Sequence, residues 1–317
     1  MYNKSLCQFF TIKNIWLKDH IKNFILKSSI NGILDPFAGN GDLLETCRKE
    51  LNINNILGYD IDKKFKWKIN DSLINIEKTN RLIITNPPFL AKNIAKRLNV
   101  NNMIKYFNNN SYNDIYQIAL FKCLEYHDKI VAIVPETFIL SNKFLDFTES
   151  ITILEENPFL NTQHPVCIIC LDKTKKNDTL LYKNNDFIMK ISELNLFKMS
   201  CENKIKIKFN DKNGNIGLRA IDGCEINNRI RFCFPNEIKN NINISSRSLT
   251  IINVEIDNSL IPTLIKTSNN ILENWRKETF DLLLAAFKNN NKNGIRRRKL
   301  DFKTARCILE KSINKIV

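Results

Sequence analysis

Histidine is scarce in this sequence, and long apolar runs are absent. The three histidines, His20, His127 and His164, do not form a cluster with metal-ligand spacing, so we expect no metal site. No run reaches the roughly 18 apolar residues of a membrane-spanning helix, and residues 1–20 lack the apolar core of a signal peptide. We therefore expect a cytoplasmic protein that uses neither a metal ion nor a membrane.

The nine cysteines are scattered along the chain. Without a secretion signal, free thiols are expected in place of disulfides. Cys167 and Cys170 form one CxxC motif within an apolar segment. A zinc site would need a second pair of ligands, so we predict that these two thiols lie in a buried strand.

The 317 residues have a globular composition, with 43% hydrophobic and 26% charged residues. Lysine and arginine outnumber aspartate and glutamate by 48 to 33, which gives a formal charge of +15. Residues 1–172 contain 20 basic and 18 acidic side chains, whereas residues 173–317 contain 28 and 15. A general drift toward lysine would enrich both halves alike, so the asymmetry predicts a polyanionic partner for the C-terminal half.

Short apolar runs alternate with helical patterns in the first half of the chain. Strands are predicted at 32–36, 55–59, 82–85, 129–134 and 165–171, and helices at 42–51, 111–126 and 143–150. This alternation predicts an α/β fold with a mostly parallel sheet. Ligands of such sheets bind at the carboxyl ends of the strands, which places the chemistry just after Leu34, Gly58 and Thr85.

The pattern changes after residue 172, so we divide the chain into domains 1–172 and 173–317. A polar segment leads to short strand candidates at 204–209, 216–220, 229–234 and 249–256, followed by helix candidates at 274–288 and 301–313. This predicts a smaller basic α+β domain with a helical C-terminal tail. Between the two helices lie the consecutive residues Arg296, Arg297, Arg298 and Lys299, which we interpret as a basic loop. It is either a phosphate contact or a solvated run of charge.

Acidic residues and glycines follow the first two predicted strands. The segment DPFAGNGD after the first strand joins an aspartate to a glycine-bent loop, which suits a nucleoside-containing cofactor. It matches neither the dinucleotide GxGxxG motif nor a P-loop. In the next segment, GYDID, the spacing allows either Asp60 or Asp62 to accept hydrogen bonds from ribose hydroxyls. Asp71 is a third acid at a predicted strand end.

The most specific motif is the segment TNPPF, directly after the apolar run LIIT. Two successive prolines fix the backbone and remove two N–H donors, so carbonyl acceptors dominate. Asn86 adds a side-chain carbonyl, and Phe89 adds an aromatic face. An acceptor-rich rigid pocket of this kind suits an amino group on a flat ring.

The motif series resembles that of the S-adenosylmethionine-dependent DNA adenine-N6 methyltransferases. The matching segments are DPFAGNGD, GYDID, NDSL and NPPF, with SYNDIYQIALFKCLEY and KIVAIVPETFI after them. Upstream, residues 7–11 resemble the QFFTP element, with Ile12 in place of the proline. The order of the motifs is similar to the gamma class of type II restriction-modification enzymes. The resemblance covers about residues 5–172 and implies a Rossmann-like methyltransferase domain.

The resemblance also implies roles for individual residues, with S-adenosylmethionine as the cofactor. The residues that would surround its methionine part are Thr11, Asp35, Ala38, Gly39 and Gly41. Asp60 would hold the ribose hydroxyls, Ile61 would pack on the adenine, and Asp71 would bind the adenine amino group. Asn86 and Pro87 would hold the target amine, and Phe89 would stack on a flipped base. Asn86, where cytosine enzymes have serine, favours adenine N6.

The implied function is transfer of a methyl group to adenine N6 of double-stranded DNA, by base flipping and direct attack. The basic C-terminal domain would recognise the target, and a cognate restriction endonuclease would be a functional partner. Two alternatives remain. One is an RNA adenine-N6 methyltransferase acting on rRNA, because NPPF also occurs in that group. The other is a non-catalytic nucleic-acid-binding protein on a methylase fold.

Overall fold

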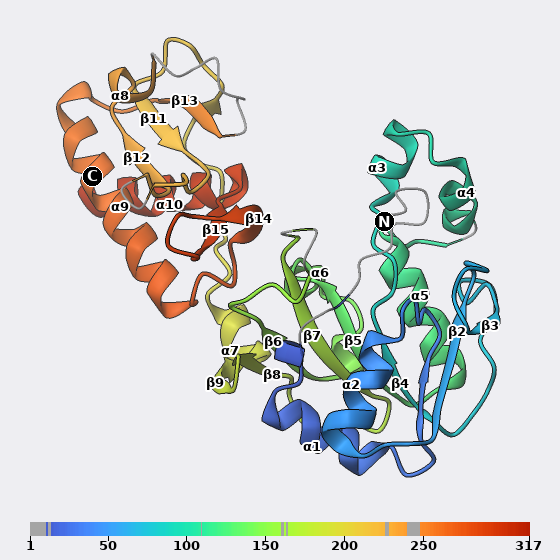
Figure 1. Cartoon of the computed structure of the whole chain (residues 1–317). Coiled ribbons are helices and arrows are strands. Elements are labelled where there is room, and N and C mark those ends of the chain that lie inside the picture. Colours follow the sequence, from blue (N-terminus) through green and yellow to red (C-terminus); the bar gives the residue numbers. More distant parts are fainter. Residues whose placement is uncertain are drawn as a thin grey trace. The chain divides into compact units, whose positions relative to one another are not determined.

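The computed structural model describes residues 11, 14–108, 110–159, 162, 164–225, 228–239 and 248–317. Of residues 7–12, which resemble the QFFTP element, only Thr11 therefore lies within the described residues. The chain divides into two compact units, Met1–Ile191 and Ser192–Val317 (Figure 1). Each unit has its own β-sheet and its own helices.

In the described part of the chain, the first unit contains a nine-stranded sheet with the order β3-β2-β1-β4-β5-β7-β6-β8-β9. Its strands are β1 Ile33–Asp35, β2 Ile56–Asp60, β3 Lys68–Ile69, β4 Leu82–Thr85, β5 Lys129–Pro135, β6 Thr148–Ile153, β7 Val166–Asp172, β8 Leu180–Lys183 and β9 Asp186–Lys190. Strands β1 to β5 are parallel, whereas β7 runs antiparallel between β5 and β6. β8 is parallel to β6, and β9 is antiparallel to β8. The expected α/β fold with a mostly parallel sheet is confirmed.

The helices of this unit are η1 Asn14–Trp16, α1 Asp19–Ser28, α2 Asp42–Leu51, α3 Lys92–Arg97, α4 Asn101–Ile104, η2 Lys105–Phe107, α5 Ile115–Tyr126, α6 Phe138–Ser141 and η3 Leu145–Phe147. Helix α2 packs against β1, β2 and β4, while α1 and α5 pack against β5. Strands β4 and β7 are buried along their whole length. A strand without a solvent-facing side needs apolar residues at nearly every position, which explains the continuous apolar runs of the sequence.

The CxxC motif lies within β7, as predicted. Cys167 and Cys170 are both fully buried among the strands of the sheet. Burial disfavours a charged thiolate, so it raises the pKa of Cys167 well above its ordinary value and that of Cys170 to about 12. Both thiols therefore contribute to the hydrophobic core as neutral groups.

The predicted helix at 143–150 is wrong. That segment forms the short η3 and then enters β6, which pairs with β7 on one side and β8 on the other. Pairing on both sides overrides the local helical pattern. Because β8 and β9 extend the sheet, the first compact unit continues to Ile191, beyond the boundary expected at residue 172.

Within its described residues, the second unit combines a four-stranded antiparallel sheet with two long helices. The sheet order is β10-β13-β11-β12, and β14 and β15 form a separate hairpin. The strands are β10 Ile207–Phe209, β11 Ile216–Arg219, β12 Arg231–Cys233, β13 Leu249–Val254, β14 Ala285–Asn290 and β15 Arg296–Lys299. The helices are α7 Ile191–Leu196, α8 Asn236–Lys239, η4 Asn258–Leu260, α9 Ile261–Glu278 and α10 Phe302–Ile316. The smaller α+β domain is as expected.

The predicted helix at 274–288 is also wrong. Helix α9 begins earlier and ends at Glu278, and β14 begins at Ala285. Phe280 and Asp281 adopt positive φ angles of 50° and 61°, a conformation that cannot continue an α-helix. Residues 274–278 of the predicted helix do belong to α9, whose buried face includes Trp275.

A buried ion-pair network connects α9 to the β14–β15 hairpin. The Arg276 guanidinium donates to both carboxylate oxygens of Asp222, at 3.1 Å each, and to Asp281 at 2.7 and 3.0 Å. Asp222 also accepts hydrogen bonds from the backbone N–H groups of Ile230 and Arg298, at 2.9 and 3.0 Å. Burial would lower the pKa of Arg276, but the hydrogen bonds to Asp281 and Asp222 outweigh it and raise the pKa. The Arg276 side chain is only 4% exposed, so its charge would be costly to bury without these partners.

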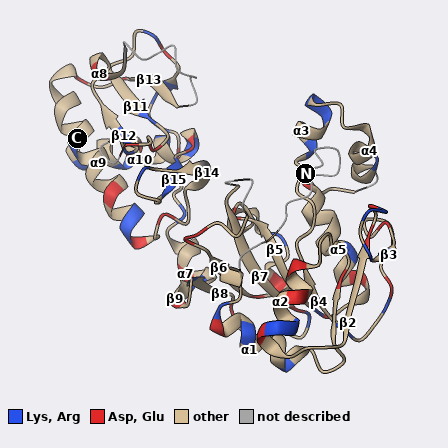
Figure 2. Ribbon diagram, viewed as in Figure 1, with Lys and Arg blue, Asp and Glu red and all other residues tan. Residues whose placement is uncertain are grey.

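Figure 2 shows lysine and arginine positions in both units, but the net positive charge is larger in the second unit. Residues 192–317 contain 23 basic and 13 acidic side chains, a net charge of +10, whereas residues 1–191 contain 25 and 20, a net charge of +5. The charge asymmetry therefore remains when the domain boundary moves from residue 172 to residue 191.

Among the described residues, no helix combines the length and the apolar character needed to cross a bilayer.

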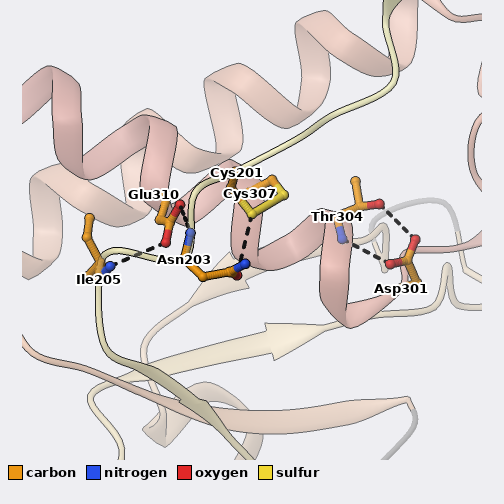
Figure 3. Close-up of a disulfide and its surroundings, with 7 residues drawn as sticks. All are labelled: Cys201, Asn203, Ile205, Asp301, Thr304, Cys307 and Glu310. Carbon is orange, nitrogen blue, oxygen red and sulfur yellow. Dashed lines mark hydrogen bonds between the residues drawn. A yellow bond between two sulfur atoms is a disulfide. The ribbon is translucent and has the colours of Figure 1, made fainter. Parts of the chain in front are cut away.

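One cysteine pair contradicts the expectation of free thiols. Cys201 and Cys307 form a disulfide that joins the segment after α7 to helix α10 (Figure 3). The same segment is fixed by Glu310, whose carboxylate accepts the backbone N–H groups of Asn203 and Ile205 at 3.2 and 3.3 Å. The two cysteines are 106 positions apart, so only the tertiary fold brings them together. The other cysteines of the described residues are free.

Candidate active site

A pocket opens at the carboxyl ends of β1, β2 and β4. Its empty volume is about 960 Å³, including the open mouth. Asp35, Asp60 and Asn86 stand at the ends of these three strands and line it. The position predicted for the chemistry, after Leu34, Gly58 and Thr85, is therefore where the pocket lies.

Most of the residues assigned from the motifs meet at this pocket. Those that line it are Thr11, Asp35, Ala38, Gly39, Asp60, Ile61, Asp71 and Asn86. Gly41, Pro87 and Phe89 belong to the same loops but are not part of the lining. The structure thus brings together residues that are up to 75 positions apart in the sequence.

Asp35 is a buried carboxyl group at the end of β1. One of its oxygens accepts the backbone N–H of Phe37 at 3.0 Å and the hydroxyl of Thr85 at 2.7 Å. Burial raises the pKa of Asp35 to about 7, although these two hydrogen bonds favour the charged form and oppose the shift. Asp35 is therefore a carboxyl group whose charge responds to the charge of a bound ligand near neutral pH.

Asp60 binds the glycine loop to the end of β2. Its two carboxylate oxygens accept the backbone N–H groups of Gly39 and Asp62, each at 2.8 Å. Asp62, the alternative ribose ligand, points to Lys64 at 2.7 Å and does not line the pocket. Burial raises the pKa of Asp60, although the hydrogen bonds oppose it. Between the two candidates, the geometry favours Asp60.

Trp67 covers the outer side of the glycine loop, a role that the motifs did not indicate. Its indole N–H donates to the carbonyl oxygen of Gly39 at 2.8 Å. A Cβ atom placed on Gly41 or Gly58 would lie 2.6 Å from the Trp67 ring. Gly41 also has a φ of +88°, which disfavours other residues. Glycine is required at both positions because the ring packs directly on the backbone.

Asn86 follows β4 and extends toward Thr11. Its side-chain amide donates to the Thr11 hydroxyl at 3.4 Å. Thr11 is 4% exposed, and its backbone forms an antiparallel bridge with Phe159. Thr11 thus connects the QFFT element to the TNPPF segment.

Phe89 lies beside this connection, packed against aromatic residues of the segment between β6 and β7. Its ring centroid is 5.9 Å from that of His164, with the rings nearly parallel, and 6.4 Å from that of Phe159. Phe89 is 7% exposed. The sequence motifs identified Phe89 but gave no sign of its two aromatic neighbours.

Ile61 and Asp71 also line the pocket. The Asp71 carboxylate accepts the backbone N–H of Leu73 at 3.2 Å and the hydroxyl of Tyr106 at 2.6 Å. Ile61 is 43% exposed, so its side chain offers an apolar surface to a ligand. A carboxylate beside an exposed apolar side chain suits a flat ring that bears a hydrogen-bond donor.

The basic run at 296–299 is not a loop. It forms β15, which pairs with β14, and its strand position turns successive side chains to opposite faces. Arg298 is only 6% exposed, while Arg297 donates to the backbone oxygen of Asp222 at 2.6 Å and covers the Phe287 ring. Hairpin pairing and the Asp222 network order this segment. Arg296, Arg297 and Lys299 are partly exposed, whereas Arg298 is part of the buried framework.

Metal-ligating side chains do not gather at this pocket. Among the residues that the structure describes, no group of three histidine, cysteine or acidic side chains has the geometry to hold a metal ion. The pocket instead combines carboxylates, amide groups and apolar surface.

The amino-acid sequence matches no family model and no curated protein. Among solved structures, the chain is similar to a candidate class I S-adenosylmethionine-dependent methyltransferase from Listeria monocytogenes, with 16% identity over 58% of this chain and 68% of that one and a TM-score of 0.42. It is also similar to a type I restriction-modification methyltransferase subunit from Streptococcus thermophilus, with 16% identity over 57% of this chain and 50% of that one and a TM-score of 0.42. A third similar structure is a candidate RNA methyltransferase from Pyrococcus horikoshii, with 16% identity over 55% of this chain and 92% of that one and a TM-score of 0.37. Because these TM-scores are low, the similarities carry no argument about function. The function is argued from the residues of the site.

Proposed function

We propose that this protein is an S-adenosylmethionine-dependent methyltransferase that methylates adenine N6 in DNA. The observation that carries the proposal is the shared pocket. Asn86 of the TNPPF segment lines the same cavity as Asp35 and Asp60, the two acids that follow β1 and β2. An acceptor for an amine therefore adjoins a site with the features of a nucleoside pocket.

The pocket has a residue that would suit each part of S-adenosylmethionine. Asp35 suits the cationic amino group of its methionine part, Asp60 suits the ribose, and Asp71 with Ile61 suits the adenine. When bound, the cofactor supplies an activated methyl group. Asn86 lines the same pocket and would hold the acceptor amine next to the methionine part of the cofactor.

The chain would activate the target by hydrogen bonding. The lone pair of an adenine amino group is delocalised into the ring, so the group is a poor nucleophile. Acceptors on Asn86 and Pro87 would pull its hydrogens out of the ring plane and localise the lone pair on nitrogen. Positioning then matters more than a strong base. Phe89 would stack on the base, which must leave the duplex to reach the pocket.

The second unit would bind the flanking phosphates. Its net charge of +10 suits a polyanion. Because Arg298 is buried, contacts from the basic run would come from Arg296, Arg297 and Lys299 on the β15 strand. If the enzyme belongs to a restriction-modification pair, its endonuclease would share the target sequence.

Replacing Arg296 and Lys299 with glutamine is expected to weaken DNA binding and reduce its salt dependence. Each lost phosphate contact makes the negative slope of log K for DNA binding against log salt concentration shallower by about 0.9. The measurement is DNA binding by fluorescence anisotropy at several salt concentrations. Replacing Lys27 on α1 and Lys176 in the first unit with glutamine removes the same charge and serves as the control. A slope unchanged in the Arg296 and Lys299 variant would show that this run is only solvated charge.

Cofactor binding is expected to strengthen as the pH rises through about 7, the pKa of Asp35. A cationic amino group binds the ionised carboxyl, so binding below this pH must release a proton and weakens by up to about tenfold per pH unit. Titration calorimetry with S-adenosylhomocysteine measures this, and Asp35→Asn should abolish the dependence. Binding that does not vary with pH in the unmodified protein would contradict this role for Asp35.

The raised pKa of Asp35 has the opposite effect on the stability of the fold. The contribution of Asp35 to folding stability is complete below the ordinary pKa of 3.8 and is lost as the pH rises through about 7.

Incubation with methyl-labelled S-adenosylmethionine tests the substrate class. The proposal predicts label in duplex DNA and little in structured RNA of the same length. Label in RNA alone would favour the rRNA alternative. Cofactor binding without transfer to either polymer would favour a non-catalytic nucleic-acid-binding protein.

A further inference from the structure

The segment between β4 and α5 forms a wall of the pocket. Residues of α4 and η2, namely Asn102, Met103, Lys105 and Tyr106, line it together with residues of the motif loops. The segment is held in place by a hydrophobic cluster in which Ala95 and Phe107 pack with Ile118 and Ala119 of α5. Tyr106 packs against the same cluster, which holds its ring in place.

The Tyr106 hydroxyl is placed on one particular carboxylate. It donates to Oδ2 of Asp71 at 2.6 Å, while the backbone N–H of Leu73 donates to Oδ1 at 3.2 Å. Two donors, one on each oxygen, fix the plane of the carboxylate. Each carboxylate oxygen can still accept a second hydrogen bond. Burial, and then the hydrogen bond to Asp71, raise the pKa of Tyr106, so it remains a donor at neutral pH.

We propose that Tyr106 is a positioning residue that fixes Asp71 to read the 6-amino group of the cofactor's adenine. The inference rests on the proposed function, because it concerns the same cofactor site. An ionised carboxylate can only accept hydrogen bonds. Held in one orientation, it binds a 6-amino purine and repels the lone pairs of a 6-oxo purine. A carboxylate that is free to rotate discriminates less between them.

The test compares two ligands that differ at this one position, S-adenosylhomocysteine and S-inosylhomocysteine, by titration calorimetry on the full chain. Tyr106→Phe removes only the hydroxyl. We expect it to weaken binding of the adenosyl ligand by about tenfold and to leave binding of the inosyl ligand nearly unchanged. Tyr126→Phe is the matched control, because Tyr126 is 37% exposed at the end of α5 and does not line the pocket. It should change neither affinity.

A double-mutant cycle separates positioning from a structural effect. In an Asp71→Asn background, Tyr106→Phe should have no further effect on the ratio of the two affinities. An equal loss for both ligands would overturn the inference and indicate only structural support. Unchanged or tighter binding of the adenosyl ligand would also overturn it, since the Tyr106–Asp71 bond would then compete with the cofactor. If the unmodified protein binds neither ligand, the proposed function fails together with the inference. In the other two cases the proposed function stands.

Discussion

The Asn86→Ala variant is expected to lose at least about a hundredfold in the rate of methyl transfer, while its affinities for duplex DNA and S-adenosylhomocysteine stay nearly unchanged. The physical reason is that Asn86 would act on the target amine after the base enters the pocket, where it polarises one N–H bond. Contacts with phosphates would depend on the second unit, and contacts with adenine and ribose on Asp60 and Asp71. Single-turnover rates and equilibrium binding on the same preparation separate these effects.

The control for this variant is Asn177→Ala, which removes an exposed amide in the same unit, away from the pocket. It should leave both the rate and the affinities unchanged. Equal losses of rate and of DNA binding in Asn86→Ala would contradict the role assigned to this side chain. A loss of cofactor affinity alone would instead make Asn86 part of the cofactor site.

The Arg276→Met variant is expected to lower the free energy of unfolding by about 3–5 kcal/mol. The substitution leaves Asp222 and Asp281 without the buried cation that neutralises them. Asp222 also orders the backbone of β15 through Arg298, so the hairpin should loosen as well. Urea unfolding followed by circular dichroism measures the loss.

Arg231→Met is the matched control for this variant. Arg231 forms a 3.5 Å ion pair with Glu237, and both side chains are more than a third exposed. Solvent screening limits such a pair to about 1 kcal/mol or less. Similar losses in the two variants would show that the Arg276 network is no stronger than a surface ion pair.

The sequence was most informative where local pattern and tertiary environment agree. The runs at 82–85 and 166–171 are apolar because both faces of the central sheet are covered, so they predicted β4 and β7 correctly. The segment at 143–150 had a helical pattern but lies between two strands, and the pairing partners decided its structure. Helix α9 ends at Glu278, and the residues that turn the chain after it, Phe280 and Asp281, carry no standard stop signal.

The pocket could be located because its main residues follow strand ends, and the carboxyl ends of parallel strands converge. This places Asp35, Asp60 and Asn86 together from the sequence alone. Trp67 and Tyr106 could not be found in this way. Trp67 packs on the glycine loop and Tyr106 lines the pocket, each from a segment without a motif and through a contact 28 or 35 positions away in the sequence. Contacts of this kind depend on how the loops fold over the sheet.

The most direct test of the account is the chemical identity of the methylated nucleoside. Duplex DNA is methylated by the purified protein with S-adenosylmethionine, digested to nucleosides and analysed by chromatography and mass spectrometry against standards. The account predicts 6-methyl-2′-deoxyadenosine as the product, and its absence after Asn86→Ala. Methylated deoxycytidine, or methylation of adenine at a ring nitrogen, would contradict the assignment of Asn86 to the adenine amino group.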